Sequence, residues 1–155
     1  RQKRRLDFSM IVQRTLDVGV CLSILTNPEI FDLISEDGAT YNDIHVDVIK
    51  DYWLSIYDEE LIGVVQIKPI TSSCYEGHIH ILKEHRKNHS KESGERIIAW
   101  CKDNLSGTLY AYTPEYCKNV TKFLESFGFL NTGVLPKAWK KNGQLNDLTI
   151  LTRLI

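Results

Sequence analysis

The stretch YEGHIHILKEHRKNHSKESGERIIAWCKDN, from Tyr75 to Asn104, decides the fold, because a strand, a basic turn and a helix follow one another in it. Polar and apolar residues alternate from Glu76 to Leu82, as a half-buried strand requires. One strand face then carries Gly77, Ile79 and Ile81, and the other carries Glu76, His78 and His80. Apolar residues recur at helical spacing further along, at Ile97, Ile98, Cys101 and Leu105. We expect the chemistry of the protein to lie in this stretch.

The segment between the strand and the helix is basic. It reads RKNHSK, from Arg86 to Lys91, and Ser90 is a plausible N-cap for the helix. Three fixed cations would then lie beside the free N–H groups of a helix start, an arrangement that favours an anion.

Composition limits the class of protein. A chain of 155 residues with 43% hydrophobic and 25% charged residues predicts one folded domain, with residues 1–6 as a frayed basic end. The net charge of −1 gives no overall positive field to gather nucleic acid. No apolar run approaches the length of a membrane span. We therefore expect a soluble, cytoplasmic protein without membrane or nucleic-acid partners.

The remaining elements alternate between strands and helices. We expect strands at 8–15, 52–57, 61–70, 109–113, 129–135 and 148–154, and helices at 18–25, after Asn27-Pro28, and from Val120 to a stop at Gly128. Residues 43–50 stay unassigned. This order predicts an α/β domain whose early strands form an antiparallel hairpin.

The cysteines and histidines do not predict a metal site. Cys21, Cys74, Cys101 and Cys117 are widely spaced, and we expect them to be reduced thiols. Cys74, Glu76, His78 and His80 share one strand face, but the sequence offers no paired Cys or His motif elsewhere to complete a zinc site.

At this point the chain resembles the GNAT superfamily of N-acetyltransferases over nearly its whole length. Three segments carry the likeness: the strand, basic turn and helix from Glu76 to Asn104, the helix NVTKFLESFGF that ends in Gly128-Phe129, and the closing hairpin TGVLPKAWKKNGQLNDLTILTRL. The resemblance implies a mixed, mostly antiparallel twisted sheet with flanking helices, splayed beside its central β-α unit. It also implies that coenzyme A enters the splay.

The resemblance also implies which residues hold acetyl-coenzyme A. The main chain of Ile81 and Lys83 would pair with the pantetheine arm. The pyrophosphate would rest on the segment formed by Arg86, Lys87, Asn88, His89, Ser90 and Lys91. Two departures matter here: His89 and Lys91 stand where the family turn has glycines, and Leu124 stands where the family has a tyrosine that serves as general acid.

Acyl transfer to an amine needs a base for the ammonium proton and an acid for the leaving thiolate. Glu76 is the first candidate base and His78 the second, because the family often places a carboxylate or histidine at the start of this strand. Tyr116 or Tyr112 would replace the missing acid.

Two hypotheses about function remain open. The first is an N-acyltransferase that moves an acetyl group from acetyl-coenzyme A to a primary amine by direct attack. The second is a GNAT-like binding or assembly protein with reduced catalysis, of phage origin and resident in the host cytoplasm. The sequence does not identify the amine, which could be a small molecule or a protein, and it leaves a homodimer open.

Overall fold

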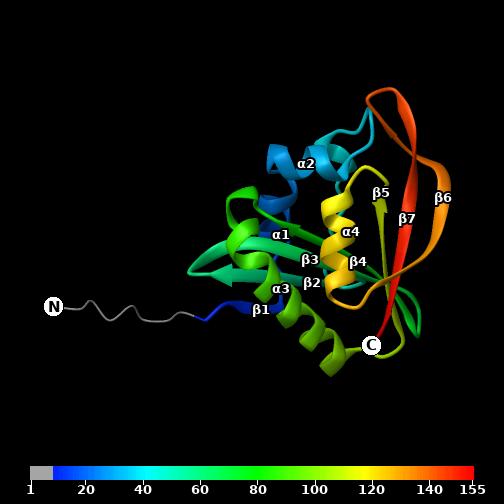
Figure 1. Ribbon diagram of the computed structural model, residues 1–155. Helices are drawn as coiled ribbons and strands as arrows, with labels where there is room; N and C mark the ends of the chain where they lie inside the picture. The colour runs from blue at the N-terminus through cyan, green and yellow to red at the C-terminus, as the bar shows by residue number, and fades with distance from the viewer. Residues whose placement is uncertain (1–8) are drawn as a thin grey trace.

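The computed structural model describes residues 9–155, so the basic end expected at residues 1–6 lies outside the described part of the chain. A seven-stranded sheet in the order β1-β2-β3-β4-β5-β7-β6 forms the centre of the fold (Figure 1). The strands are β1 Ile11–Arg14, β2 Tyr52–Asp58, β3 Glu60–Thr71, β4 Cys74–Ile81, β5 Thr108–Pro114, β6 Leu130–Lys141 and β7 Gln144–Leu154. The helices are α1 Val18–Leu25, α2 Pro28–Ile34, α3 Lys83–Asn104 and α4 Lys118–Ser126, with a 3-10 turn, η1, at Tyr41–Asp43.

The helices lie on both faces of the sheet. Neighbouring residues of β2 point to opposite faces, and each face has its own apolar cluster. Leu54 belongs to the cluster that includes Ile97 of α3 and Leu124 of α4. Trp53 belongs to the cluster that includes Cys21 of α1. The sheet is therefore the middle layer of three, and the mixed α/β architecture expected from the sequence is confirmed.

The strands β4 and β5 separate soon after they meet. They pair in parallel over only three residues, Cys74–Glu76 with Thr108–Tyr110. Beyond this point β4 pairs only with β3 in the described part of the chain, and β5 pairs only with β7. The expected splay beside the central β-α unit is therefore present, and we call it the β4/β5 gap.

The basic turn expected after the central strand is absent. The helix α3 begins at Lys83 with Leu82 as its N-cap, so the segment 86–91 lies inside the helix and Ser90 is not the cap. No glycine or proline interrupts the chain from Leu82 to Ser93, and most of its residues favour or tolerate a helix. The prediction of a turn was wrong because charge alone does not stop a helix.

The closing hairpin is longer than expected. We expected strands at 129–135 and 148–154, but β6 and β7 continue to a tip at Asn142-Gly143, where both residues have positive φ, 52° and 76°. Most side chains of β6 are exposed, so no alternating apolar pattern marks its second half. The tip is held at the end of α2, because the backbone N–H groups of Asn142 and Gly143 donate to the Asp37 carboxylate.

Two further observations complete the fold. The unassigned residues 43–50 contain no regular element beyond the end of η1. None of the helices in residues 9–155 is long and apolar enough to cross a bilayer.

The helix α3 contacts the end of α4 where Gly94 faces the ring of Phe127. A Cβ atom at Gly94 would overlap three ring atoms of Phe127, and overpacking of this kind costs about 1–3 kcal/mol. Alanine regains up to about 1 kcal/mol of helix propensity. We expect Gly94→Ala to lower the free energy of unfolding and the melting temperature, measured by thermal denaturation.

The matched control uses a smaller side chain at position 127. In a Phe127→Leu background, Gly94→Ala should be neutral or stabilising, because the ring that it would strike is gone. A Gly94→Ala variant that stabilises the parent protein would show that the two residues do not pack as described.

Candidate active site at the gap between β4 and β5

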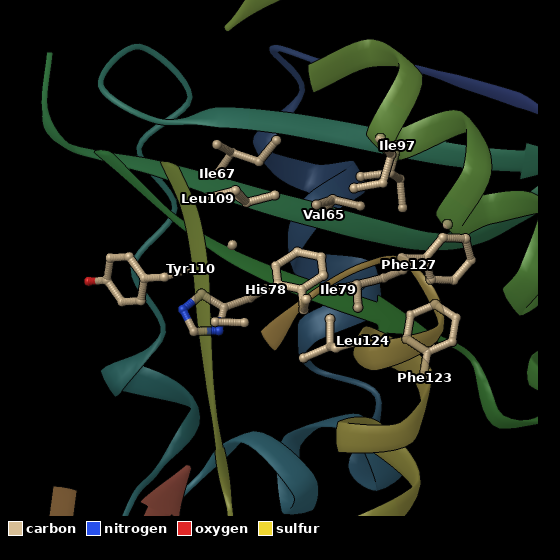
Figure 2. A pocket seen from close by; sticks show the side chains of 15 residues that line it. Val65, Ile67, His78, Ile79, Ile97, Leu109, Tyr110, Phe123, Leu124 and Phe127 are labelled. Atoms are coloured by element: carbon tan, nitrogen blue, oxygen red, sulfur yellow. The ribbon is translucent and has the colours of Figure 1, made fainter. Parts of the chain in front are cut away.

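An apolar cavity of about 60 Å³ lies at the β4/β5 gap (Figure 2). Its walls come from β3, β4, β5, α3 and α4. Figure 2 shows His78 and Tyr110 on one side of the cavity and Phe123, Leu124 and Phe127 of the α4 segment on the other. The cavity therefore connects the apolar layer under α4 with polar side chains on the opposite face of the sheet.

Three of these polar side chains form a hydrogen-bonded set that we call the Glu76 network. The Nε2 atom of His78 lies 2.8 Å from Oε2 of Glu76. The Tyr110 hydroxyl donates to the other carboxylate oxygen, Oε1, at 2.9 Å. Glu76 and Tyr110 are paired residues where β4 and β5 meet. The separation of the strands thus begins directly beside this network.

The network keeps Glu76 ionised. Its hydrogen bond with His78 lowers the pKa of the Glu76 carboxyl below the ordinary 4.5, and the Tyr110 hydroxyl acts in the same direction against the effect of burial. Burial and the neighbouring carboxylate raise the pKa of Tyr110 to about 12, so its hydroxyl keeps its proton. Because a carboxylate only accepts, Nε2 of His78 carries the hydrogen of this bond. In the neutral ring Nδ1 is then an acceptor, and it has no hydrogen-bond partner in residues 9–155.

Two aromatic side chains hold the His78 ring. The imidazole of His80 stacks on it with ring centroids 6.4 Å apart, and Tyr112 meets it edge-on at 5.1 Å. Burial lowers the pKa of His80 to about 3, and the charges of His78 and Arg86 add to this effect. Burial also raises the pKa of Tyr112. Both groups are therefore neutral near pH 7, and His78 lies between them.

The same sheet face continues as a polar surface across β3 and toward β2. Lys68 lies opposite Glu76 on β3, and Gln66 lies opposite His78. The amide of Gln66 donates to one oxygen of Asp51 at 2.9 Å, while the other oxygen of this buried carboxylate has no partner in the described part of the chain. The carboxylates of Glu76 and Asp51 therefore lie on the same face of the sheet.

The end of α2 and the tip of the β6–β7 hairpin lie beside this face. The charge of Glu36 helps to raise the pKa of Tyr112, which places the segment after α2 near the site. The Glu36 carboxylate accepts from the backbone N–H of Lys140 at 2.8 Å. Lys141 Nζ donates to the backbone oxygens of Asp32 and Ser35. These bonds fix the hairpin tip against α2.

Three side chains at the start of α3 lie against acidic side chains, and we call these contacts the α3 ion-pair cluster. One is an arginine and two are histidines, which are charged only when protonated. Arg86 donates from both terminal nitrogens to the carboxylate of Glu29, at 2.6 and 2.7 Å, and from Nε to the carbonyl oxygen of Ile81. The other two pairs are His85 with Glu60 at 3.3 Å and His89 with Asp58 at 3.1 Å. The cluster joins the start of α3 to α2 and to the β2–β3 turn.

The structure places two of the three expected catalytic residues at the gap and the third elsewhere. Glu76 and His78 lie at the gap, and Leu124 lines the cavity where the family tyrosine was missing. Tyr116 instead accepts a hydrogen bond from Trp139 Nε1 at 3.0 Å and is half exposed. Its only polar contact in the described part of the chain is therefore on β6, away from the Glu76 network.

The expected cofactor-binding residues have different surroundings from those we predicted. The carbonyl oxygen of Ile81 already accepts from Arg86. Lys83 is the first residue of α3, and the backbone groups of Lys87, Asn88, His89, Ser90 and Lys91 belong to the helix. The expectation that the amides of this run are free was wrong, because the helix starts before it.

Sequence reasoning missed Tyr110. Tyr110 and Tyr112 alternate along β5 with the same period as Glu76 and His78 along β4, so the spacing placed both tyrosines on one face. It could not show which strand would lie beside β4. In residues 9–155 no cluster of three or more potential ligands could hold a metal ion, and all four cysteines are free thiols.

No protein-family model matches the sequence, and no curated protein matches it. Among solved structures, spermidine N-acetyltransferase from Vibrio cholerae, in complex with CoA and spermine, superposes with a TM-score of 0.76 at 19% identity, over 94% of this chain and 95% of that chain. This chain has the GNAT fold. An acetyltransferase of the GNAT family from Streptococcus pneumoniae gives a TM-score of 0.73 at 14% identity, over 95% and 100% of the two chains.

A third structure agrees with this result. The GNAT fold of this chain also superposes on ribosomal-protein-alanine N-acetyltransferase from Brucella melitensis, with a TM-score of 0.68 at 16% identity over 94% and 99% of the chains. The overall fold of this chain therefore agrees with these N-acetyltransferase structures along nearly their whole length.

His80 should make the stability of the fold depend on pH. Its pKa is lowered from 6.5 to about 3, so the unfolded chain binds a proton more readily and the stability is fully present above pH 6.5. As the pH falls from 6.5 toward 3, a single such group can remove up to about 1.4 kcal/mol per pH unit. Chemical denaturation at a series of pH values measures this slope.

The control is the neutral variant His80→Gln. It should show a flatter loss of stability between pH 6.5 and 4.5 than the parent, although its stability at pH 7 is lower. Equal slopes for parent and variant would mean that His80 is not the group that resists protonation.

Proposed function

We propose that this protein is an N-acyltransferase that moves an acetyl group from acetyl-coenzyme A to a primary amine. The observation that carries the proposal is the position of the Glu76 network at the mouth of an apolar cavity, where two strands leave their edges unpaired. The GNAT fold and the N-acetyltransferases that share it support the same reaction class. Fold alone does not carry it, since one fold hosts many functions.

The residues at the gap fit the pantetheine half of coenzyme A. Facing strand edges without partners can pair with the amides of a pantetheine arm, as an added strand would. The cavity at the end of the gap is apolar and holds about two carbon atoms, judged from the 150 Å³ cavity that holds benzene. When bound, coenzyme A supplies an activated thioester carbonyl. The diphosphate half fits less well, because the α3 amides expected to receive it are bonded within the helix.

We assign the role of base to His78 rather than to Glu76. Glu76 is ionised with a lowered pKa, which makes it a weak base, and it already holds two hydrogen bonds. His78 lines the cavity and has Nδ1 free to take a proton from an incoming ammonium group. Glu76 orients the ring and stabilises the imidazolium that forms. Tyr110 in turn fixes Glu76.

The face that carries Glu76 favours a cationic acceptor. Glu76 and the buried carboxylate of Asp51 are acidic groups on this face, and one oxygen of Asp51 has no partner in the described part of the chain. An ammonium group attracted to this face would approach His78 from the side of α2 and the hairpin tip. With Leu124 in the cavity in place of a hydroxyl, the acid for the leaving thiolate is Tyr112 or the protonated His78, because His78 lines the cavity and Tyr112 contacts its ring.

A second function has its own supporting observation. The α3 ion-pair cluster engages Arg86, one of the cations that would face a diphosphate, as expected for a GNAT-like binding or assembly protein with reduced catalysis. An acetyl-transfer assay on a broad panel of amines separates the two functions. Thioester binding without transfer to any amine would favour the binding protein.

Substitutions at the Glu76 network should reduce transfer. A positioned base contributes typically about 10²–10⁴-fold, so His78→Gln should lower kcat by about a hundredfold or more. Glu76→Gln should lower it by at least about tenfold, because the amide orients the ring but does not stabilise its charge. Steady-state kinetics of amine acetylation at pH 7 measure both effects.

The control is His45→Gln, a change at an exposed histidine in the loop after η1. It should acetylate amines at the parental rate. The affinity of each variant for the thioester should stay near that of the parent, since neither side chain holds the pantetheine arm. A His78→Gln variant as fast as the parent would show that another group takes the proton.

A further inference from the structure

We infer that the acyl donor is recognised through its pantetheine arm and that the nucleotide diphosphate contributes little, so that acylated pantetheine itself is a donor. This inference rests on the proposed function and names its donor class. It follows from a contrast between the two ends of the gap: the strand edges are open, whereas the start of α3 is occupied by its own contacts.

The main chain at the start of α3 offers few donors. A diphosphate at a helix start is held by unpaired backbone N–H groups. Here the N–H of His85 already donates to the carbonyl of Leu82, and the residues from Lys87 onward lie inside the helix. The amides of Lys83 and Glu84 are free in the first turn of the described helix. The carboxylate of Glu84 lies in that same turn and opposes an anion.

The arginine of this region is held by its own contacts. Each of the three guanidinium nitrogens of Arg86 makes one hydrogen bond, two to Glu29 and one to Ile81. These bonds use three of its five N–H donors, and the Glu29 carboxylate offsets the positive charge that a phosphate would meet. The rings of His85 and His89 face Glu60 and Asp58. These contacts join the start of α3 to α2 and to the β2–β3 turn.

Side chains also stand at the two positions where the family turn has glycines. Backbone approaches phosphate closely where glycine removes the Cβ atom. His89 and Lys91 both carry side chains, and the His89 ring is fixed by Asp58 at 3.1 Å. Lys83, Lys87 and Lys91 are exposed and could draw an anion only as solvated surface charges, which contribute little.

The gap itself has the opposite character. Beyond Glu76 and Tyr110, each strand is paired on one side only, so backbone groups along both facing edges lack strand partners in residues 9–155. A pantetheine arm carries two amides and an otherwise flexible chain, which suits such edges. The Glu76 network lies beside the same gap, at the edge of the cavity. Recognition of the arm would therefore place the acyl group beside His78.

The same acylated arm occurs in free acyl-pantetheine, in acyl-coenzyme A and on phosphopantetheine-bearing carrier proteins. Calorimetry on the full chain with S-acetyl-pantetheine, acetyl-coenzyme A and phosphoadenosine diphosphate separates the contributions. We expect the two thioesters to bind within about threefold of each other, well under the factor that one lost charged hydrogen bond would produce. We expect no competition from phosphoadenosine diphosphate and little dependence on salt.

Several outcomes would overturn the inference. These are acetyl-coenzyme A binding at least about a hundredfold more tightly than S-acetyl-pantetheine, competition by the nucleotide, or no binding of S-acetyl-pantetheine. If S-acetyl-pantetheine binds as expected but no amine is acetylated, recognition through the arm stands, while the proposed transfer and the role of acyl-pantetheine as donor both fail. If only acetyl-coenzyme A binds and transfers, the function stands and the inference fails.

A pair of variants separates a structural role of Arg86 from a role in binding. Arg86→Ala and Glu29→Ala break the same ion pair, and both should lower the melting temperature. The ratio of the affinities for acetyl-coenzyme A and S-acetyl-pantetheine should stay near that of the parent in both. A tenfold fall in this ratio for Arg86→Ala alone would show that Arg86 binds the diphosphate. A carrier protein with an acetylated phosphopantetheine arm, assayed beside S-acetyl-pantetheine, shows whether carrier proteins are also acyl donors.

Discussion

The separation of β4 from β5 is the constraint on which the rest of the site depends. Backbone polar groups removed from water need partners, and β4 and β5 meet this need by pairing with β3 and β7 on their outer sides. At the closed end Gly107 lies against the carbonyl of Ser73, where a Cβ atom would not fit. The strands are held together there and diverge after three residues. The gap is thus part of the fold rather than an opening between loops.

The β4/β5 gap lies beside both the Glu76 network and the apolar cavity under α4. Glu76 and Tyr110 lie at the last paired position of the two strands, and His78 follows where the gap begins. The same point is reached from the other face by Leu124 and Phe127 of the α4 segment. An apolar cavity and a hydrogen-bonded histidine are therefore adjacent because both lie at one branching point of the sheet. A change that closes the branch would remove both.

The sequence predicted the elements better than it predicted their junctions. The alternation from Glu76 to Leu82 and the stop at Gly128 placed a strand and a helix correctly, because both signals are local. The start of α3 was missed, since its basic residues are compatible with a turn or a helix. Their partners Glu29, Asp58 and Glu60 lie far away in the sequence. The role of Tyr110 was missed for the same reason, because its bond to Glu76 depends on which strands become neighbours.

The central claim is that the facing edges of β4 and β5 receive an acylated pantetheine arm. Amide hydrogen exchange with and without S-acetyl-pantetheine tests this most directly. The expected result is slower exchange of the gap-facing amides in residues 77–81 and 111–113, with the first turn of α3 unchanged. Protection confined to the first turn of α3, or no change along either strand at saturating thioester, would contradict the claim.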